Sequence, residues 1–504
     1  MYQSQNIDFT TDEQQNKRKR IRKFEQLSSQ LLKFKIPKPK LVRNEIGNEG
    51  LIQMNKFLQD CKNIEEFDLN LSQTGINEQT VASLSCNIQK CTTLKALTLN
   101  LSKNNVDSQA SAGLFPSLLN IQSLKDIKLK LKKNNFQFEQ DLASTLAQTD
   151  YKNLKSFSLN LACNKIKAEG IIFLAQIIDQ LVNLNNISIN LNENNIDEEK
   201  SSQLGSLLKS WSSIQSLRLE VQMNIIGEQG ISELALALRN CQTINNLTLN
   251  LSQNKLSSKD VVNLAYSLQQ LTNLQNLDLD FKENEINEQG VQNLGNSLAN
   301  CHSLKSLRLS LHSNNIGEEE ASFLGSNLGK SSSIQSLIID LGYNIINAKG
   351  IQDLALGLKN CSFLSSLNLK VPYNNIRQQG VVNLGQVLAC FDNVKNLNLD
   401  ISENNFFASG TQSLCSDLAK CPNLVSLKIN LMSRNMISCN LSLINFQFGK
   451  KAQQNWFLRI VKYCFLFKQI QKSSQFISHS LPQLNWRKEC DSSQLGVRRK
   501  YDTY

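Results

Sequence analysis

The amino-acid sequence repeats with a period of 30 residues, and this period limits the chain to very few architectures. Thirteen segments align when the 504-residue chain is cut every 30 residues from Cys61 to about residue 450. Repeat positions 4, 7, 9, 11 and 16 are apolar in every segment. A fixed period of this length indicates stacked repeats, in which each repeat buries its apolar side chains against its neighbours.

Each segment carries two different apolar patterns. At positions 7, 9 and 11 the apolar residues alternate with polar ones, which predicts a strand with one buried face. Positions 21, 24 and 28 have helical spacing, as in Val261, Leu264 and Leu268. The sequence therefore predicts an α/β solenoid of about 13 repeats of 30 residues, with a parallel concave sheet and outer helices.

Two further positions are strongly biased. Position 14 is Asn in eleven of the thirteen segments, and position 20 is Gly in six. An amide both donates and accepts hydrogen bonds, so we expect the asparagines to connect the backbones of adjacent repeats. We expect the glycines where the chain turns towards the helix. The asparagines assigned this structural role include Asn104, Asn164, Asn254 and Asn314.

The pattern L-x-x-L-x-L-x-L-x-x-N-x-I-x(3)-G-[VI]-x-x-L-x(3)-L resembles leucine-rich repeats of the ribonuclease-inhibitor type. It is similar to the repeat domains of ribonuclease inhibitor, the Ran GTPase activator and NOD-like receptors, and the resemblance covers about 44–437. It implies a leucine-rich-repeat solenoid, or horseshoe. This chain has L-x-L-x-L where that family has L-x-L, so we expect a longer strand and a broader inner face.

The ends of the chain differ in charge from the repeats. The net charge is +11, of which residues 1–60 carry +5 and residues 441–504 carry +8, so the middle carries −2. We expect a basic arm at 1–43, the solenoid at 44–440, and a basic tail or irregular cap at 441–504.

Four alternatives remain for residues 441–504. They are an ordered cap, a disordered tail, non-native coding sequence, or a membrane-surface helix at 456–470. We favour the cap or the non-native segment over the membrane helix.

The sequence offers no catalytic constellation. Of its three histidines, His302 and His312 fall in one segment, and no Cys or carboxylate lies at metal-ligand spacing beside them, so we expect ordinary surface residues. The phosphate-loop-like run 325–331 falls inside the helical part of its repeat, and the motifs of protein kinases are absent. We therefore expect neither enzymatic activity nor a cofactor or metal. Six segments begin with Cys at a position that elsewhere holds Leu, Trp or Phe, which indicates a buried apolar position.

The remaining surface that suits binding is the exposed face of the sheet, at positions 6, 8 and 10. Protein hot spots favour Trp, Tyr and Arg, and charged side chains concentrate on the central repeats. The alternative is a face kept polar for solubility. The candidate protein-binding residues are Arg218, Glu220, Asp278, Asp280, Arg308 and Asp340 on the strands, with Tyr343 and Tyr373 at the adjacent rim.

We therefore expect a non-enzymatic scaffold that binds a protein or peptide partner on its concave strands. The alternatives are a regulator of a small GTPase, by resemblance to the Ran activator, or a repeat-only relative of leucine-rich-repeat kinases. We do not expect nucleic-acid binding, because the excess positive charge lies in the tails and the strands lack aromatic stacking platforms. No stretch is long and apolar enough to cross a membrane. An odd cysteine count without C-x-x-C favours a reducing compartment, the cytoplasm or the nucleus.

Overall fold

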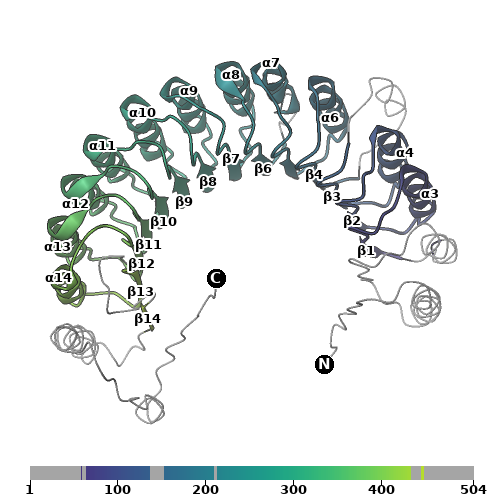
Figure 1. Cartoon of the computed structure of the whole chain (residues 1–504). Helices are drawn as coiled ribbons and strands as arrows, with labels where there is room; N and C mark the ends of the chain where they lie inside the picture. Colours follow the sequence, from purple (N-terminus) through teal and green to yellow (C-terminus); the bar gives the residue numbers. More distant parts are fainter. Residues whose placement is uncertain (1–57, 59–63, 137–152, 209–212, 433–443, 448–504) are drawn as a thin grey trace, which may run out of the picture. The chain divides into compact units, whose positions relative to one another are not determined.

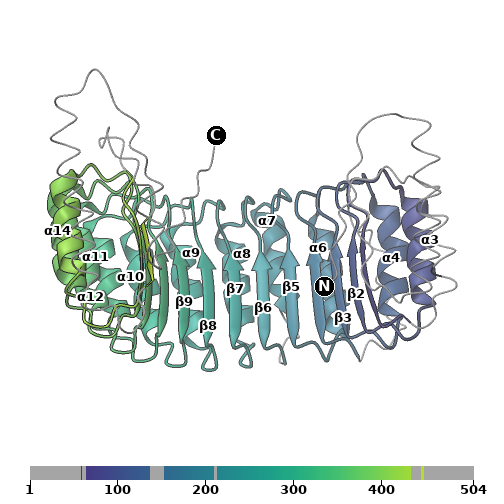
Figure 2. The same cartoon turned by 90° about the horizontal axis from the view of Figure 1, so that it is seen from below.

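A computed structural model describes residues 58, 64–136, 153–208, 213–432 and 444–447. The chain divides into an N-terminal unit, Met1–Asn254, and a C-terminal unit, Lys255–Tyr504. Each unit consists of strand–turn–helix repeats in which the strands line the inner side and the helices the outer side (Figure 1). Within each unit, the strands and helices run side by side in chain order (Figure 2).

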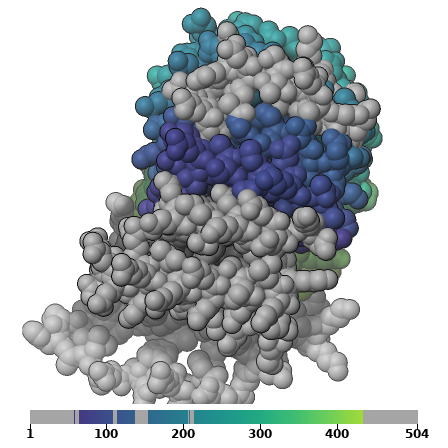
Figure 3. Space-filling model, turned by 90° about the vertical axis from the view of Figure 1, so that its right-hand side faces the viewer, coloured from purple at the N-terminus to yellow at the C-terminus, as the bar shows by residue number. Residues whose placement is uncertain are grey.

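The N-terminal unit contains seven described strands, and its first repeats form the purple and blue surface in Figure 3. In the third segment, Ser144 and Gln148 stand at positions 24 and 28, where the other segments have apolar residues, and both lie outside the described residues. The strands and helices are β1 (Glu66–Asn70), α3 (Glu78–Gln89), β2 (Ala96–Asn100), α4 (Ser108–Leu119), β3 (Asp126–Lys130), β4 (Ser156–Asn160), α6 (Ala168–Gln180), β5 (Asn186–Asn190), α7 (Glu198–Ser201), the 3-10 helix η1 (Ser202–Leu208), β6 (Ser216–Glu220), α8 (Gly227–Leu238) and β7 (Asn246–Asn250).

The C-terminal unit contains the same alternation and ends on a strand of opposite direction. Its strands and helices are α9 (Ser258–Gln269), β8 (Asn276–Asp280), α10 (Glu288–Ala299), β9 (Ser306–Ser310), α11 (Glu318–Leu328), β10 (Ser336–Asp340), α12 (Asn347–Leu358), β11 (Ser366–Lys370), α13 (Arg377–Leu388), β12 (Asn396–Asp400), α14 (Ala408–Leu418), β13 (Ser426–Asn430) and β14 (Ile444–Gln447).

In both units the strands pair in register, one repeat with the next. Ser306 lies opposite Ser336 and Glu66 opposite Ala96, so each partner is 30 residues further along the chain. Strands β1–β7 and β8–β13 are parallel to their neighbours within each unit, which confirms the predicted parallel sheet. Strand β14 pairs antiparallel with β13, so residues 444–447 cover the last parallel strand. The rest of the predicted tail, and the arm at 1–43, lie outside the described residues.

The core consists of the apolar columns that the sequence predicts. Leu307, Leu309 and Leu311, at positions 7, 9 and 11, are fully buried, as is Ile316 at position 16. On the helices, the residues at positions 21, 24 and 28 are buried as well, as in α9 and α10. Each of the strands β1–β13 covers positions 6 to 10, and position 11 follows it with its N–H bonded to the next repeat, as from Leu311 to the Asp340 carbonyl. The chain thus has a leucine-rich-repeat fold.

The glycines at position 20 lie in the first helical turn and not in the turn before it. A Cβ atom at Gly350 would lie 2.8 Å from the Cα of Glu318, and one at Gly380 would lie 2.8 Å from the Cα of Ala348. Both contacts are to the start of the helix in the preceding repeat. These glycines therefore allow neighbouring helices to approach closely, which corrects the expectation that they shape the turn.

The run 325–331 begins in α11, as predicted, and its glycines have a packing role. A Cβ atom at Gly325 would overlap the backbone of Leu354, and one at Gly357 would overlap the backbone of Gly325. Helices α11 and α12 therefore meet through backbone rather than side chains. A phosphate-binding loop has no place in this segment.

The position-14 asparagines form a hydrogen-bonded ladder between repeats. In the C-terminal unit, Nδ2 of Asn314 donates to the Phe281 carbonyl at 2.8 Å, and its Oδ1 accepts from the Ile286 N–H at 3.2 Å. The N–H of Asn314 donates to Oδ1 of Asn344 in the next repeat at 2.9 Å. These buried amides satisfy backbone groups at the point where the chain leaves the sheet, where unpaired groups would be costly.

Equivalent bonds from Nδ2 occur in the N-terminal unit. Nδ2 of Asn104 donates to the Leu71 carbonyl at 2.8 Å, Nδ2 of Asn164 to the Leu131 carbonyl at 3.0 Å, and Nδ2 of Asn254 to the Val221 carbonyl at 3.0 Å. All three asparagines are buried.

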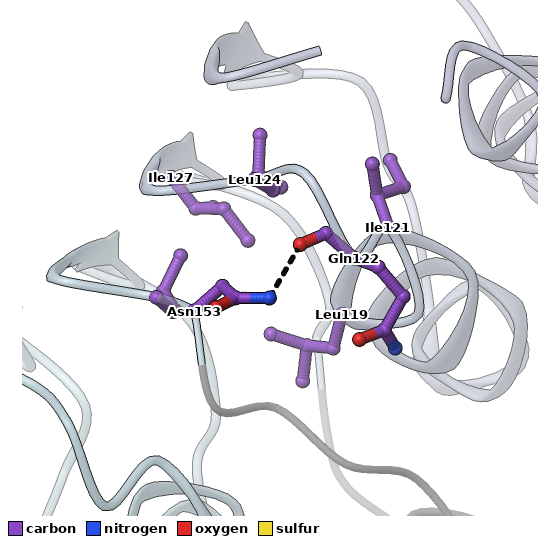
Figure 4. A pocket seen from close by; sticks show the side chains of 7 residues that line it. Leu119, Ile121, Gln122, Leu124, Ile127 and Asn153 are labelled. Carbon is purple, nitrogen blue, oxygen red and sulfur yellow. Dashed lines mark hydrogen bonds between the residues drawn. The ribbon is translucent and has the colours of Figure 1, made fainter. Parts of the chain in front are cut away.

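A second hydrogen-bonded ladder, which the apolar pattern does not predict, runs along the opposite edge of the sheet. Position 3 is Ser, Thr or Asn in twelve of the thirteen segments. The side chain donates to a carbonyl of the preceding repeat, as Ser123 does to Leu94 at 2.7 Å and Asn153 does to Gln122 at 2.9 Å. Figure 4 shows the Asn153 bond beside a small apolar cavity of about 10 Å³, which is too small for a ligand.

Candidate functional site

The candidate residues on the strands alternate with the buried leucines and are partly exposed. In the N-terminal unit, Arg218 and Glu220 lie two residues apart on β6 and form an ion pair. Glu220 also accepts hydrogen bonds from the side chains of Asn190 and Asn192 in the preceding repeat. The carboxylate is therefore held from two sides, while the Arg218 side chain stays 53% exposed.

In the C-terminal unit, Asp278 and Arg308 face each other across β8 and β9. The two residues are register partners, and Nε of Arg308 lies 3.3 Å from Oδ1 of Asp278. Their side chains are 38% and 49% exposed. Ion pairs this exposed contribute little to stability, so both side chains can exchange partners at low cost.

Position 10, where most segments carry Asn or Asp, has a structural role. Oδ1 of Asp280 accepts from the N–H of Lys282 at 3.0 Å, and Oδ1 of Asp340 accepts from the N–H of Gly342 at 3.2 Å. The asparagine of β2, Asn100, makes the same bond with Ser102 at 3.1 Å. These side chains end the strand by bonding the backbone two residues on. Only part of each carboxylate of Asp280 and Asp340 is therefore left for a partner.

Tyr343 and Tyr373 lie directly beyond β10 and β11, at position 13, and their rings stack. The ring centroids are 4.2 Å apart with an interplanar angle of 20°. His312 extends the row, with its ring centroid 5.0 Å from that of Tyr343. Tyr343 is 52% exposed. The sequence alone gives His312 no sign of this role, because its neighbours in space, Asp340 and Tyr343, come from the next repeat.

Asp340 connects this aromatic row to the strands. Nδ1 of His312 lies 3.4 Å from Oδ1 of Asp340, and Nζ of Lys370 lies 3.5 Å from Oδ2. Together with the two tyrosines these residues form one cluster at the rim of the C-terminal unit. The rim cluster consists of His312, Asp340, Tyr343, Lys370 and Tyr373.

The backbone at both tyrosines is in the left-handed region. Tyr343 and Tyr373 each have φ of 54°, as do the residues at position 13 of the other described repeats within a few degrees. Large side chains seldom occupy this region, because the Cβ atom approaches the following carbonyl oxygen. The turn geometry of the repeat imposes this conformation, and it directs the two rings outwards from the sheet edge.

The structure therefore brings together three of the predicted residues, Asp340, Tyr343 and Tyr373, and adds His312 and Lys370. Asp278 and Arg308 form a separate pair on β8 and β9 of the same unit. Arg218 and Glu220 belong to the N-terminal unit.

Five cysteines that begin repeats lie in the described part of the chain, and all five are buried packing groups: Cys91, Cys241, Cys301, Cys361 and Cys421. Burial raises the pKa of the Cys241 and Cys361 thiols to about 11 and that of Cys301 to about 12. A thiol that resists ionisation is a poor nucleophile and a poor metal ligand. No cluster of three or more His, Cys, Asp or Glu side chains suited to a metal ion occurs among the described residues. Within the same residues, every helix is too short or too polar to cross a membrane.

No protein-family model matches the chain. No curated protein sequence matches it. Among solved structures, the chain is similar to an internalin (inlF) from Listeria monocytogenes, with 17% sequence identity and a TM-score of 0.43. That similarity covers 77% of this chain and 97% of the internalin chain.

Proposed function

We propose that this protein is a non-enzymatic scaffold that binds a protein or peptide through the inner face of its strands, with the rim cluster as an anchor. The observation that carries the proposal is the stacked pair of Tyr343 and Tyr373 beside Asp340 and Lys370. Tyrosines that are already ordered and partly exposed lose little entropy on binding, and they supply large contact areas.

The energetics of the inner face support the same proposal. In the C-terminal unit, Arg308 is about half exposed, and its exposed ion pair with Asp278 costs little to rearrange. A partner that desolvates the Arg308 guanidinium group gains charge-assisted hydrogen bonds without first breaking a strong internal contact. The face thus combines rigid aromatic rings with adaptable charged groups.

We further propose that the repeats are of the ribonuclease-inhibitor type and that the protein works in the cytoplasm or nucleus. Helices of 11 to 13 residues opposite the strands, such as α6 and α11, support the repeat type. The buried, protonated thiols at position 1 support a reducing compartment, because these cysteines fill core space as apolar side chains.

Affinity capture with rim variants tests the scaffold proposal. The double variant Tyr343→Ser, Tyr373→Ser places serine at position 13. Another repeat already has serine there, Ser313, so the fold is expected to tolerate the change. The matched control is the substitution Leu236→Gln. Leu236 is an exposed residue of a helix, and two other repeats have glutamine at the same position, Gln176 and Gln386. Proteins captured from cell lysate are compared by quantitative mass spectrometry.

We expect one or more proteins to be captured by the wild-type and Leu236→Gln chains and lost from the double variant. An unchanged set of captured proteins would contradict the rim cluster as the binding anchor.

A further inference from the structure

A groove of about 280 Å³ lies in the C-terminal unit, at the edge of the sheet where β9–β11 begin. This edge is opposite to the one that carries the rim cluster, because the groove is lined by positions 2, 3 and 5 of consecutive repeats. Its lining includes His302, Lys305, Ser332, Gln335 and Phe363. Pockets that enclose a whole small molecule usually exceed about 300 Å³. The groove is therefore suited to one or two side chains of a larger ligand.

The groove is lined by hydrogen-bond donors and one cation, without any carboxylate. Within the described part of the chain, Lys305 makes no ion pair, whereas Lys95 at the same repeat position pairs with Glu65 at 2.9 Å. His302 is exposed beside it. The local field thus favours an anionic group between His302 and Lys305.

Phe363 departs from the structural rule of its position. The other segments have Ser, Thr or Asn at position 3, and these side chains bond a carbonyl of the preceding repeat, as Ser303 does with Thr272 at 2.6 Å and Asn393 does with Ser362 at 2.7 Å. Phe363 cannot make this bond, and 58% of its surface is exposed. At this position the hydrogen bond to the preceding repeat is therefore absent, and an exposed aromatic ring lies next to His302 and Lys305 in its place.

We propose that this groove binds an acidic segment of a partner polypeptide. A carboxylate lies between His302 and Lys305 and accepts further bonds from Ser332 and Gln335, while an adjacent apolar side chain packs on Phe363. The Ser303 hydroxyl already donates within the fold, so the ligand uses the other donors. This site is distinct from the proposed inner-face anchor, since it shares no residue with the rim cluster.

Fluorescence anisotropy with the full chain tests the assignment. The probe is a fluorescein-labelled peptide Gly-Glu-Glu-Phe-Glu-Gly, and the control peptide has Gln in place of each Glu. Two variants are used, the double variant His302→Ser, Lys305→Gln and the single variant Phe363→Ser. Each substitution introduces the residue found at the same position of the segment that begins at residue 331: Ser332, Gln335 and Ser333. The matched control is Lys395→Gln, at position 5 but outside the groove lining.

We expect saturable binding of the acidic peptide by the wild-type and Lys395→Gln chains. The His302→Ser, Lys305→Gln variant binds the acidic peptide about tenfold or more weakly than the wild-type chain does, because charge-assisted bonds are removed. For the same reason, the wild-type chain binds the Gln control peptide about tenfold or more weakly than the acidic peptide. Phe363→Ser weakens binding as well, while its thermal unfolding midpoint is unchanged or higher.

The proposal is overturned by the absence of saturable binding, by equal affinity in the groove variants, or by inorganic phosphate competing as strongly as the unlabelled peptide. The Tyr343→Ser, Tyr373→Ser variant keeps the groove intact. Lysate capture therefore tests the inner-face anchor and peptide binding tests the groove, so that either proposal can fail without the other.

Discussion

Oδ1 of Asn404 accepts a hydrogen bond from the backbone N–H of Asn374, the residue 30 positions earlier, at 2.7 Å. The same atom accepts from the N–H of Ile376 at 3.2 Å, and Nδ2 donates to the carbonyls of Val371 and Ile401 at 2.7 and 3.0 Å. Nδ2 also donates to the Ser402 carbonyl at 3.0 Å, so one buried side chain bonds five backbone groups of two repeats.

We expect Asn404→Ala to destabilise the C-terminal unit by about 3 kcal/mol, because it leaves buried N–H and carbonyl groups without partners. Chemical denaturation monitored by circular dichroism measures the change. The control is Asn398→Ala on the half-buried inner face, which should shift the free energy of unfolding by less than about 1 kcal/mol. Equal effects of the two substitutions would show that the asparagine ladder is dispensable.

Gly357→Ala should destabilise the same unit by about 1–3 kcal/mol, since the new methyl group overlaps the backbone of Gly325 and forces α11 and α12 apart. The unfolding midpoint in urea reports the loss. Leu356→Ala removes a larger side chain from the exposed surface of α12 and should have a smaller effect. If Gly357→Ala proves neutral, the two helices are not held in close backbone contact.

The buried thiols should make stability fall at high pH. Burial raises the pKa of Cys301 to about 12 and that of Cys361 to about 11 from an ordinary value of 9.0, so the folded state holds its protons longer than the unfolded state. Their contribution is complete below pH 9 and is lost as the pH rises towards 11–12, by about 1 kcal/mol per thiol at pH 10.

The double variant Cys301→Ala, Cys361→Ala should therefore show a smaller decrease in the free energy of unfolding between pH 8 and pH 10 than the wild-type chain. Replacing the exposed Cys86 by Ala serves as the control and should leave the decrease as it is. Identical pH dependence in all three proteins would mean that the thiols ionise freely in the folded state.

Arg308→Ala should change the free energy of unfolding by less than about 1 kcal/mol, because the Asp278–Arg308 pair is exposed. If the inner face binds a partner, the same substitution should reduce capture of that partner, and combining it with Arg218→Ala should reduce capture further. Thermal unfolding and lysate capture measure the two effects. A large loss of stability with unchanged capture would give Arg308 a structural role instead.

The repeat architecture could be predicted because every apolar column recurs with the same spacing. Leu307, Leu309 and Leu311 are buried in the structure as the alternation predicts. The role of the glycines could not be predicted, because the close approach of Gly350 to Glu318 depends on how one helix start lies against the next.

The candidate site was predictable only in part. The sequence singled out Tyr343, Tyr373 and Asp340, but it left out His312 and Lys370, whose relevance depends on contacts between three successive repeats. Asp280 and Asp340 were predicted from their charge alone, and the structure shows that one oxygen of each bonds the turn. Phe363 could have been singled out from the sequence, because the other twelve segments have Ser, Thr or Asn at position 3.

By itself, the sequence determined the strands and helices of the described repeats, the parallel order of the strands in each unit and the apolar core, because these follow from local periodicity and repeated burial. Only the tertiary structure decided which polar side chains meet. Residues 28 to 31 positions apart become neighbours when repeats stack, and whether such a pair forms a hydrogen bond, an ion pair or a stacked aromatic contact depends on distances that no local pattern encodes.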